Sequence, residues 1–433
     1  MTAYLLHLRR SPSLIGIPLG VALGLWLAYQ RLWPGVATWE AAAEGIVGSS
    51  VLLGPLFAGL AAWSGVHASR RGLTRLWMVS PRPHRAVLAL VAANATWAAA
   101  CYAVIAIVVS VPTGIDARWG APLVLWMVVG LLGVLSLVGF GTWVGVVLPF
   151  RLTAPLAATG AYLLIVALVV LSAGISPRLQ WLSPGIQQVQ DVFFATNDAL
   201  LAAQGVWFLG LLGLSLGMLF LATGGGRRVV HATVAGASTL ALVGAVAIVT
   251  MPSGFFLDRP YSERFTYSCD ADTPQLCLHP AFAGGRSELE PLLKGIAARI
   301  EGTPLEIRRI VQTNRGVGGF PPIGSTAVHF DDFRDDWAEE TVAEMVAEMF
   351  TPAFPTGPCS TVAQSNLASP YVGFTSVIVR WVSGTDSAVV LTTDEEHRAH
   401  DRFDAMDDAG KRQWITDNLD QLCSGTIDGS QVP

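Results

Sequence analysis

Arginines and apolar residues are interleaved in one short stretch, SRRGLTRLWMVSPRPHR (69–85), which lies between two apolar segments. The stretch holds five of the thirteen arginines in the first 250 residues, a region without lysine. It combines an apolar stripe at helical spacing with arginines that lie largely off the stripe: Leu73, Leu76 and Trp77 in the stripe, and Arg70, Arg71 and Arg75 beside it. Such arginines bind anionic headgroups, at about 1 kcal/mol each, and the apolar stripe is suited to docking a partner.

A second candidate for chemistry is the segment EEHRAHD (395–401), where His397 and His400 lie one helical turn apart among acids. Clusters of histidine and carboxylate can bind zinc. The chain lacks the HExxH signature of a metalloprotease and the Gly-x-Ser-x-Gly elbow of a serine hydrolase. We therefore expect a solvated helical surface here, and no catalytic residue or metal in the chain. The alternative is a zinc site with His397 and His400 as ligands.

The composition divides the chain into two physical classes. The protein has 433 residues, of which 52% are hydrophobic and only 14% are charged, against about 25% charged in a typical soluble domain. Residues 1–250 carry a net charge of +8, whereas residues 251–433 carry a net charge of −13. The break near Met251 therefore separates an apolar, weakly basic half from an acidic, water-soluble half.

The apolar half predicts a polytopic α-helical membrane protein, because a transmembrane helix needs about 20 mostly apolar residues. Seven segments meet this need, at about 13–30, 45–68, 86–111, 121–148, 154–174, 204–222 and 232–250. None contains an acid or a base in its interior, and Glu44 lies at the edge of the second segment, where it can reach the headgroups. A signal peptide cleaved near EAAAEG (40–45) is the alternative for the N-terminus, although its apolar run exceeds the usual length of about 7–15 residues.

The arginines of the short loops predict the orientation, because cytoplasmic loops carry an excess of basic residues. One set of loops holds ten arginines, and the alternate set holds only Arg31, Arg118 and Arg178. This asymmetry places the N-terminus in the cytoplasm and the chain in the cytoplasmic membrane. Seven crossings then put residues 251–433 outside.

The cysteines give an independent indication of compartment. Four of the five lie in the acidic half, and an even number confined to one region suits disulfides in an oxidising compartment. Of the three pairings we favour Cys269–Cys277, which closes a short local loop, together with Cys359–Cys423. Four free thiols are the alternative, and zinc is not expected because the CxxC spacing is absent.

The acidic half predicts a mixed α/β, mainly helical domain over 265–433, after a linker rich in Pro and Gly (251–264). Helices are expected over 287–302, with a capping box from Ser287 to Glu290, and over 335–350, 371–383 and 411–422. The segments EIRRIVQ (306–312) and STAVHF (325–330) are typical of short strands.

The membrane half lacks an energy source of its own. Ion-coupled transporters place titratable residues within the membrane, and the predicted spans offer only neutral polar groups such as Asn94 and Thr142. No GxxxxGK[ST] motif is present, so the chain is not an ATPase of that kind and needs no cofactor itself. We expect a bilayer and a protein partner, and no nucleic-acid partner.

Small residues recur at helical spacing in the first and sixth segments. Gly16, Gly20 and Gly24 form a GxxxGxxxG row, which lets helix backbones approach closely in lipid. The row could pack within the chain or between subunits. The loop 175–204 has helical periodicity, and it either lies on the outer leaflet, partly re-enters the membrane, or is a plain connector.

Six core spans, a cytoplasmic N-terminus and a basic connection after the second span resemble the membrane subunit of a type-2 ABC exporter. In that family this connection contains charged residues, a Gly, an apolar/Thr pair and a Pro-containing turn. Here Arg70–Arg71–Gly72–Leu73–Thr74–Arg75–Leu76 is followed by Ser80–Pro81–Arg82. The resemblance covers residues 1–222. The seventh span (223–250) and the outer domain look like an extension seen in some actinobacterial permeases, which suits a ratio of 25 Arg to 2 Lys.

The resemblance implies a coupling helix at 70–80 that docks into a separate ATPase subunit, which would bind ATP and Mg²⁺. It also implies a second permease copy or homologue and an exported substrate, which we expect to be amphiphilic. Two alternatives belong to other classes: a membrane-anchored enzyme or sensor whose outer domain acts, including a degenerate metallopeptidase-like domain, and a non-transporting immunity or scaffold protein.

Overall fold

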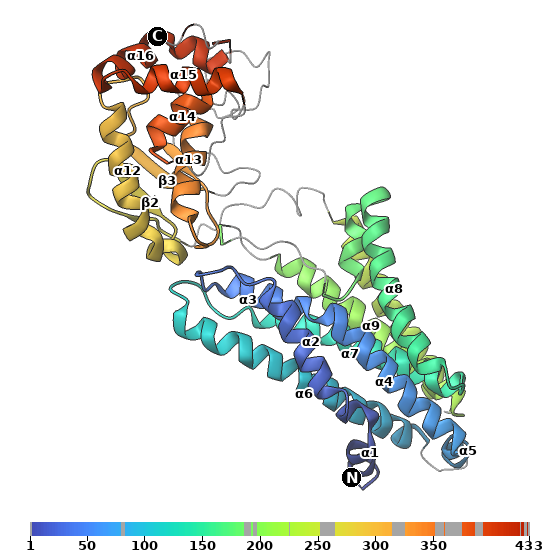
Figure 1. Cartoon of the computed structure of the whole chain (residues 1–433). Coiled ribbons are helices and arrows are strands. Elements are labelled where there is room, and N and C mark those ends of the chain that lie inside the picture. Colours follow the sequence, from blue (N-terminus) through green and yellow to red (C-terminus); the bar gives the residue numbers. More distant parts are fainter. Residues whose placement is uncertain are drawn as a thin grey trace. The chain divides into compact units, whose positions relative to one another are not determined.

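The computed structural model divides the chain into two compact units, which are coloured along the sequence in Figure 1. The helical unit comprises Met1–Leu32 and Ala37–Arg259, and the C-terminal unit comprises Trp33–Val36 and Pro260–Pro433. The structure describes residues 2–78, 83–185, 192–193, 197–224, 226–251, 265–313, 325–350, 359, 375–385, 393–424, 426–427 and 431. Nearly all of the expected linker 251–264 and the start of the expected helix 371–383 lie outside these residues.

The helical unit is built almost wholly from helices. In chain order these are α1 (Thr2–Arg10), η1 (Pro12–Leu14), α2 (Ile17–Tyr29), α3 (Trp39–Gly48), α4 (Ser50–Arg70), α5 (Leu73–Met78), α6 (Pro83–Asp116), α7 (Val124–Val147), α8 (Thr153–Gly174), η2 (Pro177–Leu182), α9 (Asp198–Ala222) and α10 (Arg227–Thr250). Among the described residues, six helical stretches are long and apolar enough to cross a membrane, with α3 and α4 counted as one stretch. The structure is thus consistent with the expected polytopic helical architecture, with six stretches of membrane-spanning length.

The first expected span differs from the other six. The segment 13–30 contains η1 and the 13-residue helix α2, which is about 20 Å long and thus shorter than a hydrocarbon core of about 30 Å. The sequence shows the cause, because Ser11 caps η1 by accepting a hydrogen bond from the Ser13 N–H, and a proline lies in the first turn of each helix, Pro12 in η1 and Pro18 in α2. A crossing at this position therefore does not follow from helix length alone.

The helices α4 and α7 pack closely along their length and run side by side (Figure 1). A Cβ on Gly141 or Gly145 of α7 would overlap the carbonyl oxygen of Ala58 or Ala62 on α4. On the α4 side, a Cβ on Gly65 would lie 2.7 Å from the Thr142 carbonyl oxygen. Glycine thus allows backbone-to-backbone contact along this pair, as small residues do in lipid.

The connection between α8 and α9 packs back into the helical unit. A Cβ on Gly133, in the interior of α7, would lie 2.6 Å from Pro184, and Gly185 (φ +77°) lies against the backbone of Val51. Gln204 is fully buried on α9, and its Nε2 donates to the Trp181 carbonyl at 2.9 Å. The described part of the loop 175–204, up to Gly185, thus packs on the helical unit, and most of the periodic segment from 186 to 196 lies outside the described residues.

The C-terminal unit contains a four-stranded sheet in the order β1-β2-β3-β4. Its elements are β1 (Ser268–Cys269), β2 (Gln275–Leu278), η3 (Pro280–Gly285), α12 (Arg286–Ile300), β3 (Arg309–Gln312), β4 (Thr326–Val328), α13 (Trp337–Met349), α14 (Thr375–Ser383), α15 (Asp394–Asp404) and α16 (Asp408–Ser424). β1 pairs with β2 in antiparallel fashion, whereas β2–β3 and β3–β4 are parallel, with Leu276 opposite Ile310. The two expected strands become β3 and β4.

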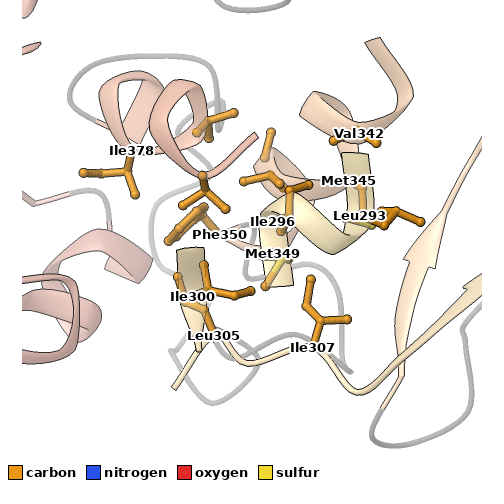
Figure 2. Packing of buried hydrophobic residues seen from close by; sticks show 14 of the residues in the cluster. Leu293, Ile296, Ile300, Leu305, Ile307, Val342, Met345, Met349, Phe350 and Ile378 are labelled. Carbon is orange, nitrogen blue, oxygen red and sulfur yellow. The ribbon is translucent and has the colours of Figure 1, made fainter. Parts of the chain in front are cut away.

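One hydrophobic core joins the helices of this unit to the sheet. Its buried members include Leu293, Ile296 and Ile300 of α12 and Val342, Met345 and Met349 of α13 (Figure 2). These residues recur every three or four positions, so each helix buries one face. The expected helix over 287–302 is present, but its expected capping box is wrong. α12 already begins at Arg286, with Gly285 as N-cap and no side-chain cap bond, which places Ser287 inside the first turn.

Candidate functional site

The arginine-rich stretch (69–85) reverses the direction of the chain between the long helices α4 and α6. α4 ends at Arg70, and Arg71 and Gly72 then donate backbone hydrogen bonds to the carbonyls of His67 and Ser69. Gly72 has φ +72°, a left-handed conformation that glycine adopts without a steric penalty. The chain then enters α5, a short helix in the position where the sequence predicts one. Residues 79–82 lie outside the described part of the chain.

The apolar stripe of α5 faces the protein rather than solvent. Trp77 is only 7% exposed, and Leu73 packs against the same cluster. The cluster draws on the ends of five long helices: Ala68 of α4, Val87, Leu90 and Val91 of α6, Val146 of α7, Leu219 and Phe220 of α9, and Val230 of α10. Trp77 is therefore not available as a docking residue, contrary to the sequence-based expectation. Its side chain instead packs α5 against the ends of these helices.

The arginines make this end of the helical unit basic. Arg70 Nε donates to the Pro149 carbonyl at 2.9 Å, which ties the α4–α5 connection to the α7–α8 connection. Exposed arginines at the same end lie on α4, on α6, on the α7–α8 connection and on α10: Arg70, Arg71, Arg85, Arg151, Arg227 and Arg228. The side chains of Arg75 and Leu76 lie outside the described residues. This end thus presents exposed arginines next to exposed apolar side chains of the α7–α8 connection, Leu148, Phe150 and Leu152.

The glycine row of the first segment packs inside the chain. A Cβ on Gly16 would overlap Leu60 of α4, and a Cβ on Gly24 would overlap Ile105 of α6. At Gly20 the nearest atom would be Cys101 Sγ, at 2.9 Å. The row therefore serves contacts of α2 with α4 and α6, which answers whether it packs within the chain or between subunits.

Two acids at the other end of the helical unit, Glu40 and Glu44, are buried. Glu44 is 8% exposed, and its Oε1 accepts a hydrogen bond from Arg31 Nη1 at 3.0 Å. The sequence suggested that Glu44 reaches the headgroups. Instead, the helix α3 turns it inward, and Arg31 compensates its charge.

His397 and His400 lie on one helix, as the sequence predicts. On α15, His397 Nδ1 donates to the Thr393 carbonyl at 2.9 Å, and His400 Nδ1 lies 3.6 Å from Asp401. Among the described residues, no group of three or more His, Cys, Asp or Glu is placed to hold a metal ion. The alternative of a zinc site therefore gains no geometric support in this part of the chain.

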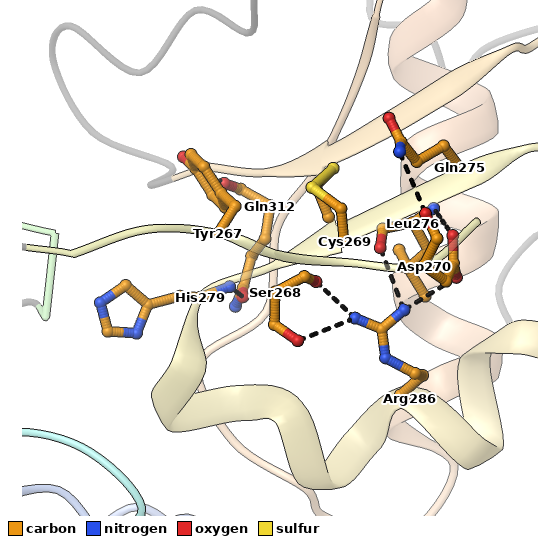
Figure 3. Close-up of a disulfide and its surroundings, with 10 residues drawn as sticks. Tyr267, Ser268, Cys269, Asp270, Gln275, Leu276, His279, Arg286 and Gln312 are labelled. Atoms are coloured by element: carbon orange, nitrogen blue, oxygen red, sulfur yellow. Dashed lines mark hydrogen bonds and ion pairs between the residues drawn. A yellow bond between two sulfur atoms is a disulfide. The ribbon is translucent and has the colours of Figure 1, made fainter.

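Two disulfides link the four cysteines of the acidic half, in the pairing favoured from the sequence: Cys269–Cys277 and Cys359–Cys423. The first joins directly opposed residues of β1 and β2 (Figure 3). Beside it, Arg286 Nη1 contacts Asp270 Oδ2 at 2.8 Å and the Leu276 carbonyl at 3.0 Å. The start of α12 is thereby bound to the edge of the sheet.

Sequence reasoning did not find the buried ion pair between His329 and Glu348, which follow β4 and lie on α13. His329 is 5% exposed, its Nε2 lies 3.2 Å from Glu348 Oε2, and its Nδ1 lies 2.9 Å from the Thr313 carbonyl. Burial alone would lower the pKa of His329, but the Glu348 carboxylate, the Thr313 carbonyl and the charge of Glu344 together raise it above the ordinary value. The two residues are nineteen positions apart, and only the fold brings them together.

The chain shows no match to any protein-family model, to any curated protein or to any solved structure. The function proposed for this chain therefore rests on the geometry of the basic end around α5.

Proposed function

We propose that this chain is the membrane-spanning subunit of an ATP-driven exporter of the type-2 ABC class. The observation that carries the proposal is the position of Trp77, which is inserted from α5 among the ends of α4, α6, α7, α9 and α10. A movement of α5 caused by a docked subunit would be transmitted to five helices through this one packed side chain. A coupling element needs such a connection, whereas a purely topogenic loop does not.

In this proposal a separate ATPase subunit, which binds ATP and Mg²⁺, docks on the exposed arginines around α5. Arg70 and Arg71 supply the charge, and Leu73 packs α5 against the cluster around Trp77. ATP-driven closure moves α5, and Trp77 passes this movement to the helices. A second permease copy completes the transporter and packs against an apolar helix face such as that of α8, where Leu156, Leu163 and Leu164 are exposed.

The proposed topology has seven crossings, with the N-terminus in the cytoplasm and the C-terminal unit outside the cytoplasmic membrane. Support comes from the basic end around α5, because cytoplasmic loops are rich in arginine. Further support comes from the two disulfides of the C-terminal unit, which suit an oxidising compartment. The exported substrate is proposed to be amphiphilic.

The test is coexpression of the full chain with the ATPase encoded beside it. We expect the ATPase to copurify and its ATP hydrolysis to rise on binding. Arg71→Glu reverses an exposed charge at the docking face and is expected to reduce copurification at least tenfold. The matched control is Arg118→Glu, an exposed arginine between α6 and α7 at the opposite end of the helical unit, which should bind the ATPase normally.

A second variant separates docking from coupling. Trp77→Ala leaves the surface arginines in place, so the ATPase should still copurify while its stimulation is lost. If no ATPase copurifies with the unaltered chain, or if Arg71→Glu and Arg118→Glu behave alike, the proposal fails.

A further inference from the structure

The connection between α7 and α8, residues 148–152, exposes large apolar side chains at the basic end of the helical unit. Phe150 is 66% exposed, Leu152 is 67% exposed and Leu148 is 48% exposed. Arg151 is exposed among them. Single exposed apolar residues are normal on a protein, whereas three within one short turn form a patch of the kind that marks an interaction site.

This turn is held in one conformation by its own hydrogen bonds. The Phe150 N–H donates to the Leu148 carbonyl at 2.8 Å, and the Thr153 N–H donates to the Phe150 carbonyl at 3.3 Å. The hydroxyl of Thr153, which is buried, also donates to the Leu148 carbonyl. A turn that is already ordered loses little conformational entropy when a partner covers it.

The lengths of the flanking helices place the turn outside the hydrocarbon core of a membrane. The helix α7 has 24 residues and α8 has 22, which correspond to about 36 Å and about 33 Å. A hydrocarbon core of about 30 Å is therefore crossed by each helix with its own residues. The apolar side chains of residues 148–152 are not needed to complete either crossing, so they lie at the headgroups or beyond them.

The turn is joined to the arginines around α5. Arg70 Nε donates to the Pro149 carbonyl at 2.9 Å, and Arg71 follows Arg70 as an exposed residue. A partner that pairs with these arginines would therefore meet the apolar turn on the same surface. The helix α5 directs Trp77 into the protein, so Trp77 leaves the apolar part of a docking contact to other residues.

We propose that residues 148–152 are a second docking element for the ATPase subunit and supply the apolar part of its contact. This inference rests on the proposed function. The partner surface that fits is an apolar depression with carboxylates at its rim. Phe150 and Leu152 fill the depression, and the arginines beside them, Arg70, Arg71 and Arg151, pair with the carboxylates. Interfaces commonly combine a desolvated apolar centre, rich in aromatic residues, with arginine and a polar rim.

The test uses the coexpressed full chain and ATPase described above. Phe150→Asp places a charge in the apolar contact and is expected to reduce copurification by about tenfold or more. The matched control is Ile175→Asp, which changes a residue that is 73% exposed at the other end of α8 and should bind the ATPase normally. If Phe150→Asp lowers the yield of folded protein, Leu152→Ser is the variant to measure, with a loss in the same direction.

A fluorescent probe distinguishes contact with the ATPase from contact with lipid. Phe150→Cys is labelled with bimane in a Cys101→Ala background, which removes the buried free thiol, and the protein is placed in phosphatidylcholine nanodiscs. We expect aqueous iodide to quench the probe, brominated acyl chains to have little effect, and bound ATPase to protect the probe from iodide. Leu163→Cys on α8 is the control, with strong quenching by brominated chains and little by iodide.

The outcomes separate this inference from the proposed function. If no ATPase copurifies with the unaltered chain, both fail together. If Arg71→Glu abolishes copurification while Phe150→Asp and Leu152→Ser bind as Ile175→Asp does, the ATPase docks on the arginines alone and only this inference is overturned. Quenching of the probe at position 150 by brominated acyl chains would identify the bilayer as the occupant and would also overturn it.

Discussion

Asn94 on α6 accepts a hydrogen bond from Ser64 on α4, with 3.0 Å between Oδ1 and Oγ. The same Oδ1 also accepts from Ser11 Oγ at 2.8 Å and from Ser13 Oγ at 2.9 Å, while Nδ2 donates to the Leu90 carbonyl. Asn94 is 1% exposed. One amide thus joins the N-terminal segment, α4 and α6 in the apolar interior, where unpaired hydroxyls are costly.

Replacing this amide should loosen the N-terminal segment. Asn94→Leu leaves the buried hydroxyl groups of Ser11 and Ser13 without their acceptor, while Ser64 keeps the Leu60 carbonyl, at a cost of about 1–3 kcal/mol in unfolding free energy. Thr239→Val is the control, because its exposed hydroxyl bonds only within α10, to the Ala235 carbonyl. Thermal unfolding in detergent should show a clear loss for the first variant and almost none for the second. Equal stabilities would contradict the role given to Asn94.

The α4–α7 contact should not tolerate even a methyl group. Gly145→Ala places a Cβ on the Ala62 carbonyl oxygen, so the helices must separate, at about 1–3 kcal/mol. Gly160→Ala is the matched control on α8, where the added Cβ meets open space and can raise stability by up to about 1 kcal/mol through helix propensity. The yield and melting temperature of the purified protein measure both changes. A neutral Gly145→Ala variant would mean that the helices are not in contact there.

The His329–Glu348 pair should make the stability of the C-terminal unit depend on pH. Because the pKa of His329 is raised in the folded state, its stabilising contribution is fully present below about pH 6.5 and is lost as the pH rises through the folded pKa. Glu348→Gln keeps the size of the side chain and removes its charge, so the decline should flatten. Thermal unfolding of the full chain between pH 6.5 and 8.5 measures both, and parallel curves for the two proteins would rule out this contribution.

His279 should have the opposite dependence. Burial lowers its pKa to about 3, and its Nδ1 accepts a hydrogen bond from the Ala281 N–H at 3.2 Å. The neutral ring is therefore the folded form, so its contribution is present above about pH 6.5 and is lost as the pH falls towards 3. His279→Gln should reduce the loss of stability between pH 6.5 and 4, measured by the same unfolding experiment. An unchanged acid limb would show that His279 is not the group concerned.

The two disulfides should differ in their contribution to stability. Cys359–Cys423 closes a loop of 64 residues and Cys269–Cys277 a loop of 8, so loop entropy assigns about 4 and about 2.5 kcal/mol to them, respectively. Replacing each pair by serine should therefore cost more at Cys359–Cys423. Urea unfolding of the C-terminal unit within the full chain, followed by tryptophan fluorescence, gives the order. The reverse order would show that packing around Cys277 outweighs the loop entropy.

The sequence by itself determined the physical class and most of the elements. Apolar runs of membrane length gave six long helices, because hydrophobicity and length are local properties of the chain. Helical spacing located α12, α13 and α16, since each must bury one face. The confinement of four cysteines to one region predicted two disulfides. The first span stays a prediction, because hydropathy counts apolar residues but does not register that the segment is divided into η1 and the short helix α2.

Only the tertiary structure decided which element each apolar or glycine-lined helix face packs against. The spacing of Leu73 and Trp77 predicts an apolar stripe but not its direction, and the helix ends around α5 turn it inward. Gly141 and Gly145 form a pair at helical spacing whose partner, α4, is fixed by the fold. Arg70 and Pro149 lie 79 positions apart in the sequence, and only the fold joins them by a hydrogen bond. Contacts between distant segments depend on how the helices pack, and no local pattern in the sequence records that.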